Sequence, residues 1–294
     1  MSFLILIIGF ALLIKGADVF VEGASSIAKK FNVPSMIIGL TIVAMGTSAP
    51  EAAVSVTSSL AGQNDMSVAN VVGSNFFNVL VVLGVSSIIA KLPVQEETIK
   101  KDTPFLILVS ILLLVFGINL KLGRIEGLAL LGLFTYFLVN TIKSAKKATE
   151  DDSLETGETA IAIETQTSSE ISLPKTILVS IIGIVGIVLG GDMVVNSATS
   201  IATSLGMSAN LVGLTIVAVG TSLPEFVTSI VAIKKGETEI AIGNVIGSNL
   251  FNILLVLGLA AVINPISMSM LAFIDIIFMV LITLLLYMFM KFSC

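Results

Sequence analysis

The sequence predicts an all-α polytopic membrane protein built from two five-helix repeats of inverted topology. Three observations predict this fold class. First, 55% of the 294 residues are hydrophobic, only 12% are charged, and the mean hydropathy is +1.08, which excludes an ordinary soluble domain. Second, apolar runs of membrane-spanning length recur along the chain. Third, the segment GLTIVAMGTSAPE at 39–51 returns as GLTIVAVGTSLPE at 213–225.

Nine apolar segments are long enough to cross a bilayer, because about 20 helical residues cover roughly 30 Å of hydrocarbon. The first segment lacks the basic flank and the cleavage site of a signal peptide, so we expect it to remain as a helix. The predicted spans lie near residues 2–26, 33–60, 67–90, 103–119, 125–143, 174–202, 208–233, 239–263 and 267–290.

Basic residues between these spans are strongly biased to one side of the membrane. Only Lys121 and Arg124 fall on the other side. The positive-inside rule therefore predicts that the crowded side is cytoplasmic and that the N-terminus lies outside, in a multi-pass protein of the cell membrane. The twelve lysines of the crowded side are Lys29, Lys30, Lys91, Lys100, Lys101, Lys143, Lys146, Lys147, Lys175, Lys234, Lys235 and Lys291.

Residues 144–173 interrupt the apolar pattern with a segment rich in Thr, Ser and Glu. Because such a segment buries little apolar surface, it predicts an acidic cytoplasmic linker between a first transmembrane repeat, residues 1–143, and a second, residues 174–294. A regulatory calcium site is the alternative for its acidic cluster. The glycine and the closing glutamate of an EF-hand loop are missing from the spacing, which favours a plain linker.

The two halves are internal repeats in a single register. Adding 174 to a residue number carries Glu51 onto Glu225, and it carries NVVGSNFFN at 70–78 onto NVIGSNLFN at 244–252. Five spans precede the linker, an odd number, so the second repeat must enter the membrane from the opposite face. Only four spans follow the linker, and we expect a tenth helix, the counterpart of residues 125–143, that is absent from this sequence.

The first repeated segment places a proline inside a membrane helix in each half. Pro50 and Pro224 lack an amide hydrogen, so the carbonyl groups four residues earlier lose a helical partner. Free carbonyls in a membrane must face something polar, which predicts a broken helix that contributes to a cation site. Two hydroxyl residues and a glutamate flank each proline on roughly one face, namely Thr47, Ser48 and Glu51, and Thr221, Ser222 and Glu225.

The second repeated motif predicts a polar stripe along a helix in each half. Such a stripe also occurs as a contact between neighbouring membrane helices, and this alternative remains open for the stripe by itself. Combined with two intramembrane glutamates, it predicts a binding site. The stripe has four-residue spacing and consists of Asn70, Ser74 and Asn78 in one half and Asn244, Ser248 and Asn252 in the other.

Glu51 and Glu225 decide the chemistry of the predicted site. An ionised glutamate inside a membrane needs a proton, a basic partner or a bound cation, and neither motif has a Lys or Arg nearby in sequence. The chain contains no His, so the metal ligands must be oxygens. Two carboxylates with hydroxyls, amides and carbonyls suit one calcium ion or several sodium ions. Protonated structural glutamates are the alternative.

The pairs GTSAPE and GTSLPE, and GSNFFN and GSNLFN, resemble the alpha-repeats of the sodium/calcium exchanger family, within the cation/calcium antiporter superfamily. The chain as a whole is similar to the short prokaryotic members. The resemblance is close in the helices that carry these motifs. It implies five plus five helices of inverted topology, a central cluster of ion sites, and a pair of helices, the first and the sixth, that slides to open each side in turn.

The resemblance also implies roles for individual residues. Glu51 and Glu225 would be the ligands shared by calcium and sodium, and Ala44 and Ala218 would contribute backbone oxygens to outer sodium sites. The remaining implied ligands are Thr47, Ser48, Ser74, Asn78, Thr221, Ser222, Ser248 and Asn252.

The resemblance leaves the roles of two further pairs of residues less defined. Some relatives carry an acid at one of the positions of Asn78 and Asn252, so the resemblance leaves the ion stoichiometry open. We assign Asp18 and Asp192, which also match under the repeat, structural or gating roles rather than direct ligation.

The sequence therefore predicts a secondary antiporter that exchanges sodium for calcium, with a proton/calcium antiporter as the alternative. Proton-coupled relatives resemble a GN..E pattern where this chain has GTS.PE, which favours sodium. A channel or an intramembrane protease fits less well, because the chain completes its own symmetry and LGGD at 189–192 lacks the GxGD spacing. We expect a monomer in the lipid bilayer that binds calcium and sodium, with no cofactor, no enzymatic activity and no nucleic-acid partner.

Overall fold

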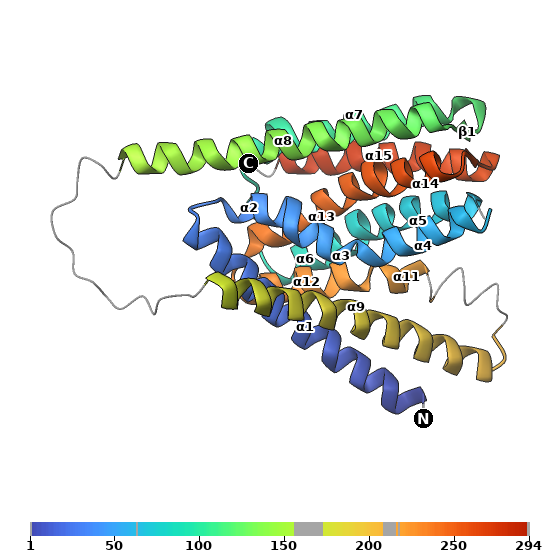
Figure 1. Cartoon of the computed structure of the whole chain (residues 1–294), viewed down its shortest axis with the longest axis horizontal. Helices are drawn as coiled ribbons and strands as arrows, with labels where there is room; N and C mark the ends of the chain where they lie inside the picture. Colours follow the sequence, from blue (N-terminus) through green and yellow to red (C-terminus); the bar gives the residue numbers. More distant parts are fainter. Residues whose placement is uncertain (1, 63, 156–172, 208–215, 217, 293–294) are drawn as a thin grey trace.

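The computed structural model describes residues 2–62, 64–155, 173–207, 216 and 218–292, and most of them are helical (Figure 1). The α-helices of the first half are α1 (Ser2–Lys30), α2 (Ser35–Ile38), α3 (Ala44–Thr47), α4 (Ala49–Leu60), α5 (Asn64–Phe77), α6 (Gly84–Ile89), α7 (Thr103–Phe116) and α8 (Arg124–Glu155). Those of the second half are α9 (Leu173–Ser204), α11 (Ala218–Thr221), α12 (Leu223–Lys234), α13 (Thr238–Phe251), α14 (Gly258–Ile263) and α15 (Met270–Phe292).

Wider π-helical turns join several of these helices into longer spans. They are η1 (Gly39–Val43) between α2 and α3, η2 (Asn78–Leu83) between α5 and α6, η3 (Thr98–Asp102) before α7, and η7 (Asn252–Leu257) between α13 and α14. A 3-10 turn, η4 (Gly117–Asn119), follows α7. Because π-helical turns are frequent at functional sites, it is notable that η2 and η7 each begin at a predicted ligand, Asn78 and Asn252.

Seven of the described helical segments are long and apolar enough to cross a membrane, and the bent pair 35–47 and 49–60 makes an eighth. These eight correspond to eight of the predicted spans. The predicted span 208–233 lies partly outside the described residues, and α11 and α12 are its described part. The all-α polytopic fold is confirmed. Within the described residues it has one small exception, because the connections β1 (Lys121–Leu122) and β2 (Ile266–Ser267) pair antiparallel and satisfy each other's backbone groups.

Helix α8 is longer than the sequence predicted. It continues to Glu155, so residues 144–155 of the predicted linker are helical. The stretch SAKKATE at 144–150 consists mostly of residues with high helix propensity, which favours continuation of the helix beyond the apolar span. Residues 156–172 lie outside the described part, and the division into two repeats and a linker stays a prediction.

The prediction of a broken helix at each proline motif is confirmed. α3 ends at Thr47 and α4 begins at Ala49, with a bend of 48° between the two helical segments. The residue between them, Ser48, has φ −82° and ψ 9°, and Ser222 has φ −90° and ψ 5° between α11 and α12. Each proline lies in the first turn of the following helix, where its missing amide hydrogen costs nothing.

Helices α1 and α9 pack side by side across one face of the bundle (Figure 1). Glycines make this contact close: a Cβ atom added at Gly16 would lie 2.8 Å from the carbonyl oxygen of Gly183. One added at Gly190 would lie 2.8 Å from the carbonyl oxygen of Gly9. Any larger residue at these positions forces the two helices apart.

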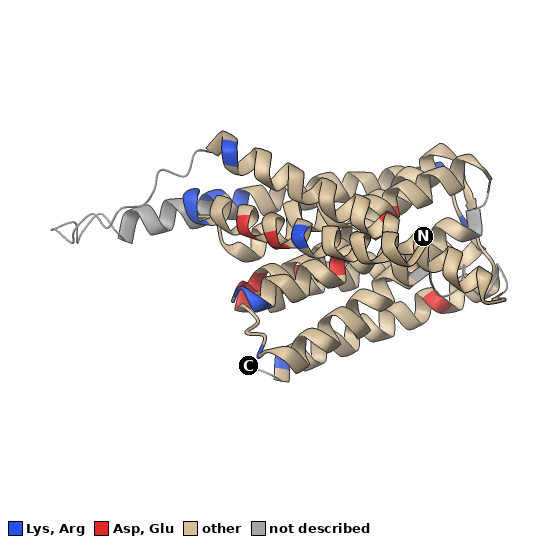
Figure 2. Cartoon of the chain, turned by 90° about the horizontal axis from the view of Figure 1, so that it is seen from below, with Lys and Arg blue, Asp and Glu red and all other residues tan. Residues whose placement is uncertain are grey.

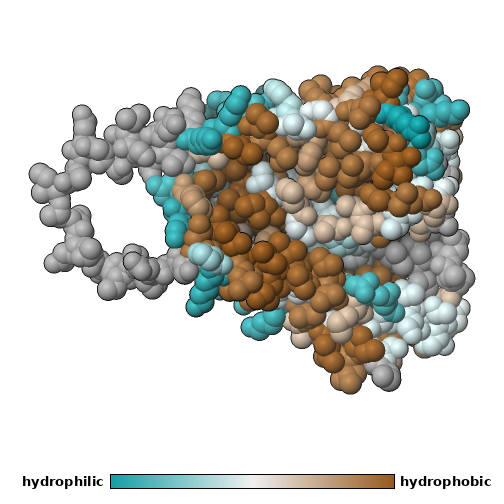
Figure 3. Space-filling model, viewed as in Figure 1, coloured by the Kyte–Doolittle hydropathy of each residue, from teal (hydrophilic) through white to brown (hydrophobic). Residues whose placement is uncertain are grey.

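Polar and apolar surfaces are segregated along the molecule. Hydrophobic residues cover much of the middle of the visible face, and hydrophilic residues lie mostly towards its ends (Figure 3). Lys and Arg gather at one end (Figure 2), which we term the lysine-rich end. We use this name for the end where α1 and α12 finish, with Lys29 in the last turn of α1 and Lys235 directly after α12. The span Thr238–Ile263 is the most buried of the candidate spans, so the second polar stripe runs through the interior.

Candidate ion-binding site

Each of the two intramembrane glutamates lies in the first turn of a helix that starts at a break. Glu51 and Glu225 are both fully buried. The first turn of a helix carries backbone amides without helical partners and a partial positive charge, and both stabilise a carboxylate. The breaks in the second and seventh predicted spans therefore create two places for negative charge inside an apolar bundle.

Each carboxylate is held by a serine from the other half of the chain. Ser48 donates to Oε1 of Glu225 at 2.8 Å, and Ser222 donates to Oε1 of Glu51 at 3.2 Å. Ser74 donates a second bond to Oε1 of Glu51 at 3.4 Å. The two carboxylates also lie close enough to repel each other electrostatically, so a positive charge between them is favourable.

The threonine before each of these serines contacts an asparagine of the opposite stripe. Thr47 donates to Oδ1 of Asn244 at 3.0 Å, and Thr221 donates to Oδ1 of Asn70 at 3.4 Å. Through Nδ2, each asparagine donates in turn to the backbone carbonyl of the glutamate in its own half, at 3.2 Å for Asn70 and 3.3 Å for Asn244. These two asparagines thus connect helices, which is the role that the alternative interpretation gave to the stripe.

The asparagines at the other end of each stripe present their carbonyl oxygens. Asn78 donates through Nδ2 to Oδ1 of Asn249 at 3.1 Å, and Asn252 donates through Nδ2 to Oδ1 of Asn75 at 3.1 Å. The Oδ1 atoms of Asn78 and Asn252 are buried and accept no hydrogen bond from any described residue. Because their amide nitrogens are already engaged, these two residues offer acceptors to any ligand.

Within the part of the chain that the structure describes, four buried side-chain oxygens of predicted ligands have no hydrogen-bond partner. A buried polar atom left in this state costs about 1–3 kcal/mol. All four are acceptors, so a cation satisfies them and an anion does not. Carboxylate and amide oxygens are hard ligands that suit calcium and sodium, and the donor set therefore fits these ions. The four atoms are Oε2 of Glu51, Oε2 of Glu225, Oδ1 of Asn78 and Oδ1 of Asn252.

The predicted backbone ligands are less well supported by the geometry. The carbonyl oxygen of Ala44 already accepts the backbone amide of Ser48 at 3.0 Å and the hydroxyl of Thr47 at 3.4 Å. Ala218 begins α11, and the environment of its side chain lies outside the described part. Sodium binding by these two carbonyls stays a prediction. The hydroxyl of Ser248 lies 3.4 Å from that of Thr47, within the same hydrogen-bonded region.

Two asparagines that the sequence analysis did not single out complete this region. Asn75 and Asn249 are almost fully buried and fix the orientation of the amides of Asn252 and Asn78. A signal for them was present, because each follows the serine of the repeated GSN motif. Four-residue spacing selects a single helix face, however, and these side chains lie beside that face and contact the other half of the chain.

Asp18 and Asp192 make none of the contacts described for this cluster. Asp18 pairs with Lys235 at 2.9 Å, at the lysine-rich end, and Asp192 is exposed on α9. The structural or gating roles that we assigned to them stay a prediction.

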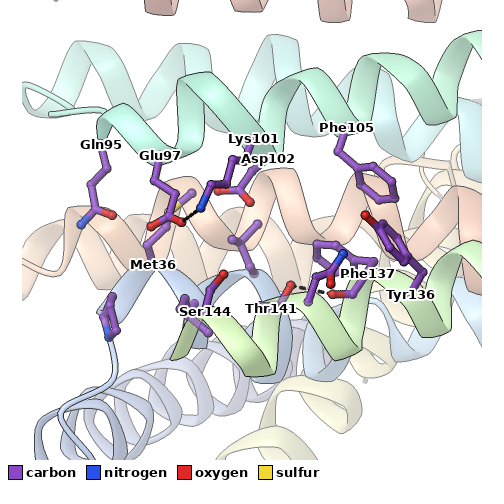
Figure 4. Close-up of a pocket in the computed structure, with 14 residues that line it drawn as sticks. Met36, Gln95, Glu97, Lys101, Asp102, Phe105, Tyr136, Phe137, Thr141 and Ser144 are labelled. Carbon is purple, nitrogen blue, oxygen red and sulfur yellow. Dashed lines mark hydrogen bonds and ion pairs between the residues drawn. The ribbon is translucent and has the colours of Figure 1, made fainter. Parts of the chain in front are cut away.

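A separate cavity of about 240 Å³ lies beside Lys101 (Figure 4). Lys101 forms an ion pair with Glu97 at its edge, and Phe105, Tyr136 and Phe137 line it further along α7 and α8. None of the predicted ion ligands lines this cavity. It is therefore distinct from the cluster around the two glutamates.

Both the sequence and the fold are similar to those of known proteins. The family profile described as sodium/calcium exchanger protein matches residues 1–143 and 175–293. CaxA from Alkalimonas amylolytica is 43% identical over 263 residues, which cover 88% of this chain and 80% of the relative. The sodium/calcium exchanger MaX1 from Methanosarcina acetivorans is 33% identical over 296 residues, covering 91% and 85%. A solved structure of the sodium-calcium exchanger NCX_Mj has a TM-score of 0.85 and 32% identity, covering 99% of this chain and 90% of that one.

Proposed function

The chain belongs to the sodium/calcium exchanger protein family, and from this premise we propose that it exchanges sodium for calcium across a membrane by alternating access. Membership of the family supports cation/calcium antiport, and sodium as the driving ion is the further step. The observation that carries the proposal is a set of four buried acceptor oxygens, two on the glutamates of the broken helices and two on asparagines at the starts of η2 and η7, which have no hydrogen-bond partner among the described residues. We propose that Glu51, Glu225, Asn78 and Asn252 bind the transported ions directly.

Charge balance explains why such a site exchanges ions rather than releasing them freely. With both glutamates ionised, the site carries about two negative charges, which one calcium ion or two sodium ions neutralise. An ion-free site leaves two buried carboxylates uncompensated, and this is costly in a low-dielectric interior. The change between outward-facing and inward-facing states is therefore easiest when the site is loaded, which couples the movement of one ion to that of the other.

The repeat symmetry supports a monomeric transporter. Each half supplies one glutamate and the serine that holds the other half's glutamate, so one chain completes the site. We propose that the lysine-rich end faces the cytoplasm and that the N-terminus lies outside, because the lysine bias follows the positive-inside rule. Interhelical polar contacts of Asn70 and Asn244 hold the broken helices in place around the site.

Vesicles that contain this protein are expected to accumulate calcium when an outward sodium gradient is imposed at clamped pH. Sodium that binds from inside the vesicle neutralises the carboxylates. The loaded site then opens to the outside, where sodium leaves and calcium binds. The measurement is radioactive calcium uptake, with empty vesicles as the control. Proton/calcium exchange is the second candidate, since two protonated glutamates balance the same charge. Uptake that follows a pH gradient and ignores sodium would assign that function instead.

Exchange is expected not to require potassium. Potassium-dependent relatives resemble this chain except for an acid at the position of Asn252, which here is a neutral amide bonded to Asn75. Once calcium has neutralised the two glutamates, the site has no negative charge left for an additional cation. The test replaces potassium by choline on both sides at fixed sodium and clamped voltage and measures calcium flux. A flux that collapses without potassium contradicts this interpretation of Asn252.

A further inference from the structure

Helices α1 and α9 are expected to move as one body, because their backbones interlock. A Cβ atom added at Gly16 would lie 2.7 Å from the backbone nitrogen of Ile187, and one at Gly190 would lie 2.5 Å from that of Leu13. Helices packed this closely cannot separate without leaving a void. Any rearrangement of the transporter therefore shifts the pair together, relative to the helices that carry the ion site.

This pair packs differently against the two helices that follow the proline breaks, α12 and α4. α1 packs along α12, and its residues from Phe20 to Ala28 share a buried cluster with Ile233 and Ile240. By the repeat symmetry α9 corresponds to α1 and α4 corresponds to α12, but α9 and α4 make little or no contact. The contact between α1 and α12 therefore closes the bundle at the lysine-rich end. No equivalent contact between α9 and α4 closes it at the other end.

Salt bridges tie α1 to the turn between α12 and α13 at the closed end. Lys235 contacts Asp18 at 2.9 Å and Glu22 at 3.3 Å. Lys29 contacts Glu237 at 3.2 Å. Both basic residues thus bridge two elements that belong to different halves of the chain.

The inverted repeat does not reproduce this network at the other end. Shifting by 174 residues preserves Asp18 as Asp192 but replaces every other member with an uncharged residue. Because neither lysine has a basic counterpart at the equivalent position, Asp192 cannot form the same ion pairs there. The equivalents of Glu22, Lys29, Lys235 and Glu237 are Asn196, Thr203, Ala61 and Gln63.

We propose that Asp18, Glu22, Lys29, Lys235 and Glu237 form a one-sided latch, which favours the state that is closed at the lysine-rich end. This inference rests on the proposed alternating access. Two repeats of identical sequence would make the inward-facing and outward-facing states equal in free energy. The latch removes this equality, because its ion pairs form in only one of the two states.

The latch is weak enough to open during each transport cycle. The side chain of Lys235 is 28% exposed and that of Asp18 is 40% exposed, so water and salt screen their attraction. An exposed network of this kind changes an equilibrium by about threefold. Loss of the latch should therefore redistribute the two states without abolishing ion binding.

The test compares Lys235→Gln with Lys234→Gln. Lys234 is the exposed neighbouring lysine, and none of the described ion pairs involves it, so this control removes the same charge from the same place. The half-saturating calcium concentration is measured from each side of oriented vesicles, because the apparent affinity on a side scales with the fraction of protein open to it. Loss of the latch exposes the site more often at the lysine-rich side, so less calcium is needed there. The half-saturating calcium concentration at the lysine-rich side, divided by that at the opposite side, is therefore expected to fall about threefold in Lys235→Gln only.

Further variants and conditions sharpen this test. Asp18→Asn should give a similar shift, and the double variant should add little to either single change, as expected for residues in one network. Raising ionic strength with choline chloride should produce the shift in the parent but not in Lys235→Gln. Equal ratios in Lys235→Gln, Lys234→Gln and the parent, or equal shifts on both sides of the membrane, would overturn the latch.

Hydrogen exchange separates failure of the latch from failure of the proposed function. In purified protein without any ion gradient, backbone amides of residues 235–240 are expected to exchange about threefold faster in Lys235→Gln than in Lys234→Gln. This result supports the latch even if no sodium/calcium exchange is detected. Identical exchange in the two variants refutes the latch even if transport is normal.

Discussion

Replacing Glu51 or Glu225 by Gln is expected to abolish calcium transport while leaving the protein folded. The amide keeps the shape of the side chain and an oxygen that accepts the bond from Ser222 or Ser48. It removes one of the two charges that offset dehydration of the ion. It also replaces the carboxylate oxygen that faces the ion by an NH₂ group, which donates hydrogen bonds and cannot bind a cation. Removing the charge of a buried carboxylate that pairs with the calcium ion costs about 3 kcal/mol or more of binding free energy, which corresponds to about 100-fold weaker calcium binding.

Thermal unfolding with and without calcium checks both parts of this expectation. Calcium should raise the melting temperature of the parent, because it binds only the folded state, and should have little effect on either variant. Without ions, the variants should be at least as stable as the parent, since one of two repelling buried charges is gone. Glu96→Gln is the matched control, because that carboxylate is 81% exposed. Transport at the parent's rate, or unfolding of both variants, would show that these glutamates are not ion ligands.

Gly247→Ala is expected to destabilise the protein and to impair transport. A Cβ atom at this position would lie 2.4 Å from the carbonyl oxygen of Leu40 and 2.8 Å from the Cβ of Ala44. Overpacking of this kind costs about 1–3 kcal/mol. It pushes α13 away from η1 and α3, and the bond that Thr47 donates to Asn244 lies across that contact.

Gly84→Ala provides the control for this prediction. Gly84 is also in a helix, but apart from its chain neighbours and its own helix backbone no described atom lies within 4 Å of an added Cβ. Alanine there should leave stability unchanged or raise it slightly through its higher helix propensity. The measurements are the melting temperature in detergent and the rate of sodium-driven calcium uptake. Equal stability of the two glycine variants would mean that the close approach of α13 to α3 is not required.

The sequence by itself determined the membrane fold and the location of the charged groups. Apolar runs of sufficient length become helices in a bilayer whatever their neighbours are, because the backbone must satisfy its own hydrogen bonds there. A proline inside such a run interrupts the helix through its own covalent structure, so the breaks at Ser48 and Ser222 follow from local chemistry. The position of Glu51 and Glu225 just after these breaks follows from the same local argument.

Hydropathy was less informative at the ends of helices. It marks where an apolar run stops, whereas a helix continues as long as its residues favour the helical backbone. For this reason α8 extends to Glu155, beyond the predicted end of its span at residue 143. Hydropathy and spacing also did not single out Asn75, Asn249 or Lys235, since Asn and Lys are common on helices without any specific partner.

Only the tertiary structure decided which atoms meet. Spacing along one helix determines which residues share a face of that helix, but the bonds from Ser48 to Glu225 and from Asn78 to Asn249 join residues 177 and 171 positions apart. Such contacts depend on how two spans rotate and slide against each other, and no local pattern specifies this. The same is true of Lys235, which in sequence is one interfacial lysine among many and in the fold bridges two acidic residues of α1.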